Sequence, residues 1–211
     1  MVSSSRVETN INSSQLIYAQ NIFCIELDPK KLFQIAGLMT LNKPQVYYSR
    51  IKTIDSNITN LVNFQEPYSF YSANLPIYTN NFQFIYFAKS RFSKNSLYEN
   101  VIAPVLKDDL WVESWGRPYM DSFCKPEYSY DVLNIRHVDI AGFLWKDTQD
   151  HSKWAVSANK DWTCYGDQNM MNSQNTRGGG SLCMLNSQFS KLHRKMVSDK
   201  DSCETFLRKY Y

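Results

Sequence analysis

Strand-like and helix-like runs alternate without interruption along the 211 residues, and this alternation leaves few folds open. Strand-like runs show period-two apolar patterns or short apolar stretches, whereas helix-like runs place apolar residues three and four apart. No internal repeat and no linker-like stretch separates these runs. The pattern therefore predicts a single α/β domain in which helices cover a sheet. A content of 43% hydrophobic and 20% charged residues is typical of such a folded chain.

Local patterns predict the individual elements. Asp28 and Pro29 form an N-cap and first-turn pair that opens a helix, and Pro44 stops that helix from running further. The other expected helices are 96–106 and 187–197. The expected strands are 20–27, 46–51, 81–89, 110–115, 132–140, 153–157 and 162–166. A turn-rich stretch is expected at 52–80, and a flexible arm at 1–14 before a domain spanning 15–211.

The cysteines bear on the compartment in which the chain works. Five of them are spread along the sequence without a CxxC pair: Cys24, Cys124, Cys164, Cys183 and Cys203. Such spacing fits long-range disulfides in an oxidising compartment. Glycosylation sequons at Asn12 and Asn57 agree with secretion. The amino terminus shows no signal-peptide core, which leaves a cytosolic protein or a removed leader, and we expect a secreted or lysosomal protein.

Charge and hydropathy indicate little about partners. The formal net charge of +3 permits contact with nucleic acid but does not by itself indicate it. No apolar run approaches the roughly 18 residues that a membrane-spanning helix needs, so no membrane association is expected.

The segment from 150 to 169 carries the chemistry. If His151 and Lys153 lie in a strand, they share one face, while Trp154 and Val156 point into the core. An imidazole can attack phosphorus or protonate a leaving oxygen, and a fixed ammonium stabilises charge on the other phosphate oxygens. The pair therefore suits cleavage of a phosphodiester without a metal. Asn169, after a tight turn at Gly166, is placed to donate its amide to the same oxygens.

Two other histidines test how specific this pattern is, because a lone His-x-Lys triplet is weak support. His193 and Lys195 repeat the triplet, but in a helix positions two apart are rotated by roughly 200° and do not share a face. We expect a solvated basic turn there. His137, in an expected strand, is expected to be structural, although an approach to substrate stays open.

Basic residues and glycines offer secondary candidates. Lys89, Arg91 and Lys94 alternate with phenylalanines and are candidate contacts for a DNA strand, although a solvated strand end explains them nearly as well. Three consecutive glycines, 178–180, lack the Gly-Lys-Ser/Thr ending of a P-loop and predict a turn with positive φ. Arg177 beside them is a candidate phosphate contact. A serine or cysteine hydrolase is disfavoured, because no GxSxG motif is present.

Three segments in fixed order resemble the carboxy-terminal signature of the deoxyribonuclease II family: DHSKW from 150, WTCYGDQN from 162 and RGGGSLC from 177. This family belongs to the phospholipase D superfamily, whose motif is His-x-Lys followed by Gly-x-x-Asn. In this sequence the motif is matched by His151, Lys153, Gly166 and Asn169. The resemblance spans about 20–203.

The resemblance implies a phospholipase D-like single domain, with a mixed β-sheet flanked by helices, that cleaves DNA without metal or cofactor. The superfamily's Asp five positions after the Lys is replaced by Ala158, which disfavours a phospholipase activity. The resemblance also implies disulfides Cys164–Cys183 and Cys124–Cys203. Cys24 is then left over, and either burial or an intermolecular bond accounts for it.

Family members carry two histidine motifs, one to attack phosphorus and one to protonate the leaving oxygen. This sequence has no histidine before His137, so the resemblance implies that a homodimer sharing one composite site completes the machinery. The alternative is a catalytically silent secreted relative that binds DNA or host proteins.

Overall fold

The computed structural model describes residues 25, 27–44, 46, 55–63, 65, 71–118 and 120–204. Several expectations fall outside this part of the chain and stay predictions. They concern the arm at 1–14, the strand at 46–51, most of the strand at 20–27, Cys24 and the sequon at Asn12.

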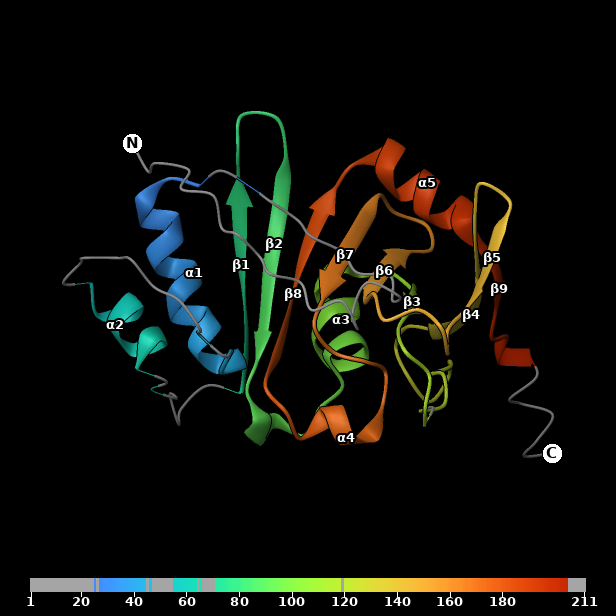
Figure 1. The fold of residues 1–211 in the computed structure, drawn as a ribbon, viewed down its shortest axis with the longest axis horizontal. Helices are drawn as coiled ribbons and strands as arrows, with labels where there is room; N and C mark the ends of the chain where they lie inside the picture. Colours follow the sequence, from blue (N-terminus) through green and yellow to red (C-terminus); the bar gives the residue numbers. More distant parts are fainter. Residues whose placement is uncertain are drawn as a thin grey trace.

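Helices and strands build one mixed α/β domain as expected (Figure 1). They do not alternate regularly, because the strands between Leu110 and Gly166 follow one another without a helix among the described residues. The helices are α1 (Pro29–Asn42), α2 (Ser56–Val62), α3 (Ala103–Leu106), α4 (Asn172–Asn175) and α5 (Ser187–Met196), with a 3₁₀ turn η2 (Arg91–Ser93) and a π-helical segment η3 (Leu97–Ile102). The strands are β1 (Ser72–Tyr78), β2 (Gln83–Lys89), β3 (Leu110–Glu113), β4 (Val132–Ile140), β5 (Phe143–Lys146), β6 (Trp154–Ser157), β7 (Trp162–Gly166), β8 (Gly179–Leu185) and β9 (Val197–Lys200).

The described strands form one nine-stranded sheet in the order β1-β2-β8-β7-β6-β3-β4-β5, and β9 also pairs with β4. The pair β3–β4 is parallel, whereas the other pairs are antiparallel. The predicted mixed sheet is therefore confirmed. Within the described residues, no helix has the length and apolar character that a bilayer crossing requires.

Both faces of the sheet are covered. The continuous segment η3–α3 packs on one face against the larger core cluster, which includes Phe87, Leu110, Ala155 and Cys164. Helix α1 packs on the other face of β1, β2 and β8, and α5 lies farther along the sheet, over β7 and β6 (Figure 1). Because neighbouring strand residues point to opposite faces, the central strands are apolar on both sides.

The start of α1 is confirmed at the predicted position. Asp28 caps it, since its carboxylate accepts a hydrogen bond of 2.9 Å from the amide of Lys31, and Pro29 occupies the first turn. The helical prediction for 96–106 is also confirmed despite Pro104, which lies in the first turn of α3. The turn-rich prediction for 52–80 is wrong in part, because α2 and β1 lie within it.

The disulfides Cys164–Cys183 and Cys124–Cys203 are both present. The first joins residues that are directly opposite on β7 and β8. The second connects the loop before β4 to the segment after β9, and it closes 79 residues of chain.

The expected positive-φ turn at 178–180 is wrong. Gly179 and Gly180 lie in β8, and a Cβ on Gly179 would stand 2.3 Å from the side-chain nitrogen of Gln168. A Cβ on Gly180 would stand 2.3 Å from the amide nitrogen of Asn42. Close approach of neighbouring groups, and not turn geometry, is what requires glycine here.

The two disulfides differ in the length of chain that they close, and this difference predicts how much each contributes to stability. Replacing Cys124 and Cys203 by Ala should lower the free energy of unfolding by about 4–5 kcal/mol, and replacing Cys164 and Cys183 by about 3 kcal/mol. Urea unfolding of the two double variants measures both values. An equal or reversed order would contradict the loop-closure explanation.

Candidate functional site

The residues of interest gather at one edge of the sheet, the edge at which β3 and β7 end and β6 begins. In the strand register, Glu113 at the end of β3 lies opposite Trp154 at the start of β6, and Trp154 lies opposite Tyr165 near the end of β7. On the next pair, Gly166 lies opposite Ser181 near the start of β8. The segments that follow β3 and β7 and that precede β6 therefore emerge together.

His151 and Lys153 precede β6, which begins only at Trp154, so the strand expected at 153–157 starts one residue later. Asp150 bends the chain before the strand, because its buried carboxylate accepts a hydrogen bond of 2.7 Å from the amide of Ser152. Shared strand alternation thus does not align the two side chains. Instead the Lys153 ammonium donates to the main-chain carbonyl of His151, and both residues are partly exposed. Trp154 is buried in the core as predicted.

Trp115 is a site residue that the sequence reasoning missed. Its ring lies 5.2 Å from the imidazole of His151, centroid to centroid, with the planes inclined by 50°. Such a contact restricts the orientation of the imidazole. The run 110–115 was expected to form a strand, but β3 ends at Glu113 and leaves Trp115 free to turn toward His151.

Asn169 is fixed by its two neighbours. The Tyr98 hydroxyl donates a hydrogen bond of 2.6 Å to the carbonyl of Gln168, and the buried Gln168 side chain donates one of 2.9 Å to the carbonyl of Arg177. On the other side, the amide of Met170 donates to the Ser114 hydroxyl at 2.9 Å. The Asn169 Oδ1 atom is buried and has no hydrogen-bond partner among the described residues.

Lys89 and Arg177 occupy contrasting positions. Lys89 is fully buried, and its ammonium donates to the carbonyls of Asn175 at 3.0 Å and Arg177 at 2.7 Å. This placement supports the loop before β8 and does not fit the expected contact with a DNA strand. Burial lowers the pKa of Lys89 to about 8. Arg177 is exposed, and its guanidinium donates to the carbonyl of Asp167 at 2.6 Å.

Arg91 and Lys94 are both exposed near the end of β2. The Arg91 guanidinium lies 4.8 Å from the centroid of the Phe92 ring, and Lys94 ends the η2 turn with a φ of 55°. Their expected contact with DNA stays a prediction.

Burial and charge tune the pKa values around His151. Burial, followed by the charge of Lys153, lowers the pKa of His151, whereas Asp150 opposes the shift. Burial is also the main cause that lowers the pKa of Lys153, and the carboxylates nearby partly offset it. A lower pKa makes the imidazolium available only under acidic conditions.

Glu113 is the most unusual ionisable group at this edge. It is fully buried, and neither carboxyl oxygen has a hydrogen-bond partner among the described residues. Burial is the main cause that raises its pKa from 4.5 to about 9. An acidic residue within the otherwise apolar run 110–113 was the available sequence signal.

The other histidines lie outside this site. His193 is buried, not solvated as expected, and its Nε2 lies 2.6 Å from the Tyr165 hydroxyl. Lys195, two positions later, is exposed, so the predicted difference in helix faces is confirmed. His137 lies on β4, with its Nδ1 3.2 Å from a carboxylate oxygen of Asp199, which agrees with a structural role.

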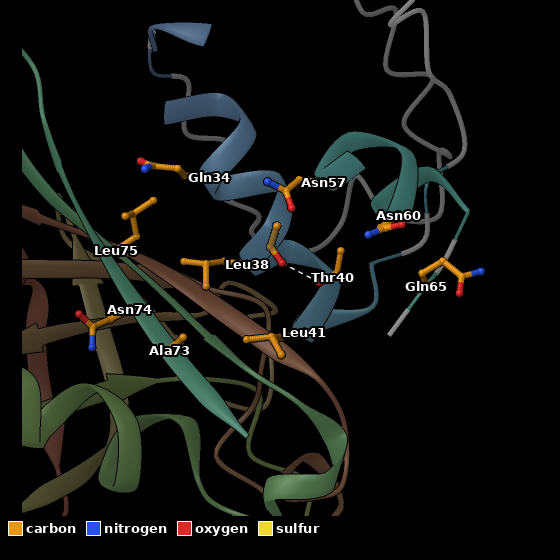
Figure 2. A pocket seen from close by; sticks show the side chains of 11 residues that line it. Gln34, Leu38, Thr40, Leu41, Asn57, Asn60, Gln65, Ala73, Asn74 and Leu75 are labelled. Atoms are coloured by element: carbon orange, nitrogen blue, oxygen red, sulfur yellow. Dashed lines mark hydrogen bonds between the residues drawn. The ribbon is translucent and has the colours of Figure 1, made fainter. Parts of the chain in front are cut away.

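A hollow of about 650 Å³ lies elsewhere, among α1, α2 and the edge strand β1 (Figure 2). Amide side chains, among them Gln34, Asn57 and Asn74, line it together with Leu38 and Leu75. β2, β8 and β7 separate β1 from β6, so the hollow does not coincide with the histidine site. The half-buried Asn57 lies in α2 and not in the expected turn-rich stretch, and its glycosylation stays a prediction.

One cluster of potential metal ligands brings together Cys124, Asp131 and Cys203. Its two sulfurs are bonded to each other, so they are not thiolates that could bind an ion.

Comparison with known proteins connects this geometry to a family. The family model Deoxyribonuclease II matches residues 3–203. The chain belongs to the deoxyribonuclease II family. The resemblance carried by the three signature segments is thereby confirmed.

Individual relatives agree with this family assignment. Deoxyribonuclease-2 of Caenorhabditis elegans is 32% identical over 196 residues, which cover 88% of this chain and 52% of the relative. Plancitoxin-1 of Acanthaster planci is 31% identical, with 87% of this chain and 54% of the relative covered. Deoxyribonuclease-2-alpha of Sus scrofa is 27% identical, with coverage of 89% and 54%. The chain spans about half the length of the relatives it matches.

The charge of Lys153 should affect the pKa of His151. The substitution Lys153→Gln removes a cation that lowers the pKa of His151, so this pKa should rise. NMR titration resolves the change, since the chain has three histidines. Lys94→Gln removes the same charge from an exposed lysine. It is the control and should leave the pKa of His151 unchanged. A fall in the His151 pKa in the Lys153 variant would contradict the electrostatic assignment.

Proposed function

We propose that this chain acts as an acid endodeoxyribonuclease that hydrolyses DNA phosphodiester bonds without a metal ion. His151 serves as nucleophile or general acid, Lys153 stabilises charge on the phosphate oxygens, and Asn169 donates its amide to the same oxygens. Arg177, Arg91 and Lys94 are proposed DNA contacts.

The observation that most supports this proposal is the gathering of the three motif residues at one sheet edge. The Lys153 ammonium donates to the main-chain carbonyl of His151, and Asn169 is fixed through Gln168 and Met170. Positioned donors of this kind stabilise charge that develops on a phosphate with little reorganisation. Family membership agrees, because relatives of this chain bear the names deoxyribonuclease-2 and deoxyribonuclease-2-alpha.

Acid dependence follows from the direction of the His151 pKa shift. A general acid must carry its proton, and burial and Lys153 both favour the neutral imidazole. Activity should therefore fall as pH rises through the lowered pKa. Disulfides and acid dependence together support a secreted or lysosomal location.

A second imidazole is required if one histidine attacks while another protonates the leaving oxygen. The sequence contains three histidines, and two of them are engaged elsewhere: His137 lies against Asp199 and His193 against the Tyr165 hydroxyl. We propose that a second copy of the chain supplies its own His151 across a two-fold axis.

Plasmid nicking tests the proposed activity. At about pH 5 in the presence of EDTA, the parent protein should nick supercoiled DNA, and His151→Ala should lose at least about 100-fold in rate. His137→Ala is the matched control and should retain the activity, because His137 lies outside the site.

Three outcomes would contradict the proposal. Equal nicking by the parent and His151→Ala would remove the role of His151. Loss of activity in EDTA with recovery in magnesium would contradict the metal-independent mechanism. No nicking by any variant, with DNA binding retained, would instead favour a silent DNA-binding relative.

A mixing experiment tests the composite site. An excess of His151→Ala protein should convert parent chains into mixed dimers with one imidazole, and the parent's activity should fall accordingly. The same excess of His137→Ala should not lower it. Sedimentation that shows a strict monomer with full activity would rule out the shared site.

A further inference from the structure

We propose that Glu113 is a further positioning residue of this site, one that lies beside Lys153 as a neutral acid and leaves the lysine charge available to a substrate phosphate. This inference rests on the proposed function and deepens it. It assigns a role to a residue that neither His-x-Lys nor Gly-x-x-Asn includes.

The environment of Glu113 favours the neutral form. The side chain is fully buried, and both oxygens lack a hydrogen-bond partner among the described residues. An ionised carboxylate is costly in such a place unless a cation and hydrogen-bond donors compensate it. A buried polar group without partners is also uncommon in folded proteins and is more often found where chemistry requires it.

Glu113 lies between the two parts of the motif. Its strand partner is Trp154, which directly follows Lys153. The next residue, Ser114, holds the amide of Met170, which directly follows Asn169. A change in the charge or position of Glu113 is therefore felt by both groups proposed to contact the phosphate.

The charges that face Glu113 come from several elements. Asp150 and Asp147 oppose its ionisation, while Lys153 and Arg136 favour it. Arg136 is already engaged, because its guanidinium makes two hydrogen bonds, of 2.6 and 2.7 Å, with the carboxylate of Asp201. Burial outweighs the two cations, and the pKa of Glu113 rises to about 9.

The neutral form matters because the substrate is an anion. An ionised Glu113 would attract the Lys153 ammonium into a buried ion pair and would repel a phosphodiester. A neutral Glu113 has neither effect. The site thereby keeps its positive charge throughout the acidic range in which His151 is protonated.

Thermal unfolding measures the charge state directly. A carboxyl with a raised pKa is protonated in the folded chain and ionised in the unfolded chain between about pH 4.5 and 9, so its contribution to stability is lost as pH rises through this window. The difference in Tm between Glu113→Gln and the parent should therefore increase with pH in favour of the variant. Glu113→Met, neutral and without polar atoms, should show the same trend. A difference that moves toward the parent would mean an ionised, paired Glu113 and would overturn the inference.

DNA binding separates a positioning role from a merely structural one. The probe is a short labelled DNA duplex in EDTA, and every variant carries His151→Ala to prevent cleavage. As pH rises through about 9, binding by the Glu113 protein should weaken on the order of ten-fold relative to Glu113→Gln, whereas the two should bind equally at acidic pH. In a Lys153→Gln background this difference should shrink, because the ion pair can no longer form.

The outcomes distinguish the two proposals. DNA binding with the same pH dependence in all backgrounds would overturn the role of Glu113 and leave the nuclease proposal standing. Failure of every variant to bind DNA at any pH would overturn both, even if the unfolding data show a neutral Glu113.

Discussion

Strand β6 is held between β3 and β7, and the positions of the three motif residues and of Glu113 depend on this pairing. The register places Trp154 opposite both Glu113 and Tyr165. Because the core lies on both faces of β6, a slip of one residue would exchange Ala155 with its large neighbours, Trp154 and Val156. The register is thus specified by packing, and it brings the chain before β6 next to the ends of β3 and β7. The disulfide Cys164–Cys183 joins β7 to β8, the next strand in the sheet.

The balance of charge at this edge follows from burial more than from ion pairing. Lys89 is buried, and its ammonium donates to two main-chain carbonyls. Glu113 is buried, and its carboxyl oxygens have no hydrogen-bond partner among the described residues. Desolvation favours the neutral form of both. The half-buried Lys153, beside His151, and the exposed Arg177, whose charge acts on Lys153, remain as cations. In the proposed function, a phosphate binds at this edge against the Lys153 ammonium and the Asn169 amide.

The fold class, most helices and the central strands are predictable from the sequence, because their patterns are strong. The capping pair Asp28–Pro29, the apolar runs of β2 and β4, and both disulfides were all predicted. The strands that were not predicted are β1, β5, β8 and β9. β1 contains a proline, β5 is apolar but only four residues long and exposed, β8 opens with two glycines, and β9 is polar apart from Val197. β8 and β9 pair with β2 and β4, which are distant in sequence, and local periodicity does not contain such pairing.

The motif residues of the site were found through family spacing, but their surroundings were not. The burial of Lys89 and His193 arises from tertiary packing, and alternation of basic and aromatic residues cannot indicate it. The places of Trp115 and Glu113 in the site depend on where β3 ends, and the sequence pattern does not give this end.

The most direct test of the central claim is a crystal structure of the His151→Ala protein with a short DNA duplex. We predict a phosphate in contact with the Lys153 ammonium and the Asn169 amide. DNA bound elsewhere, for example at the hollow of Figure 2, with this edge empty, would contradict the assignment.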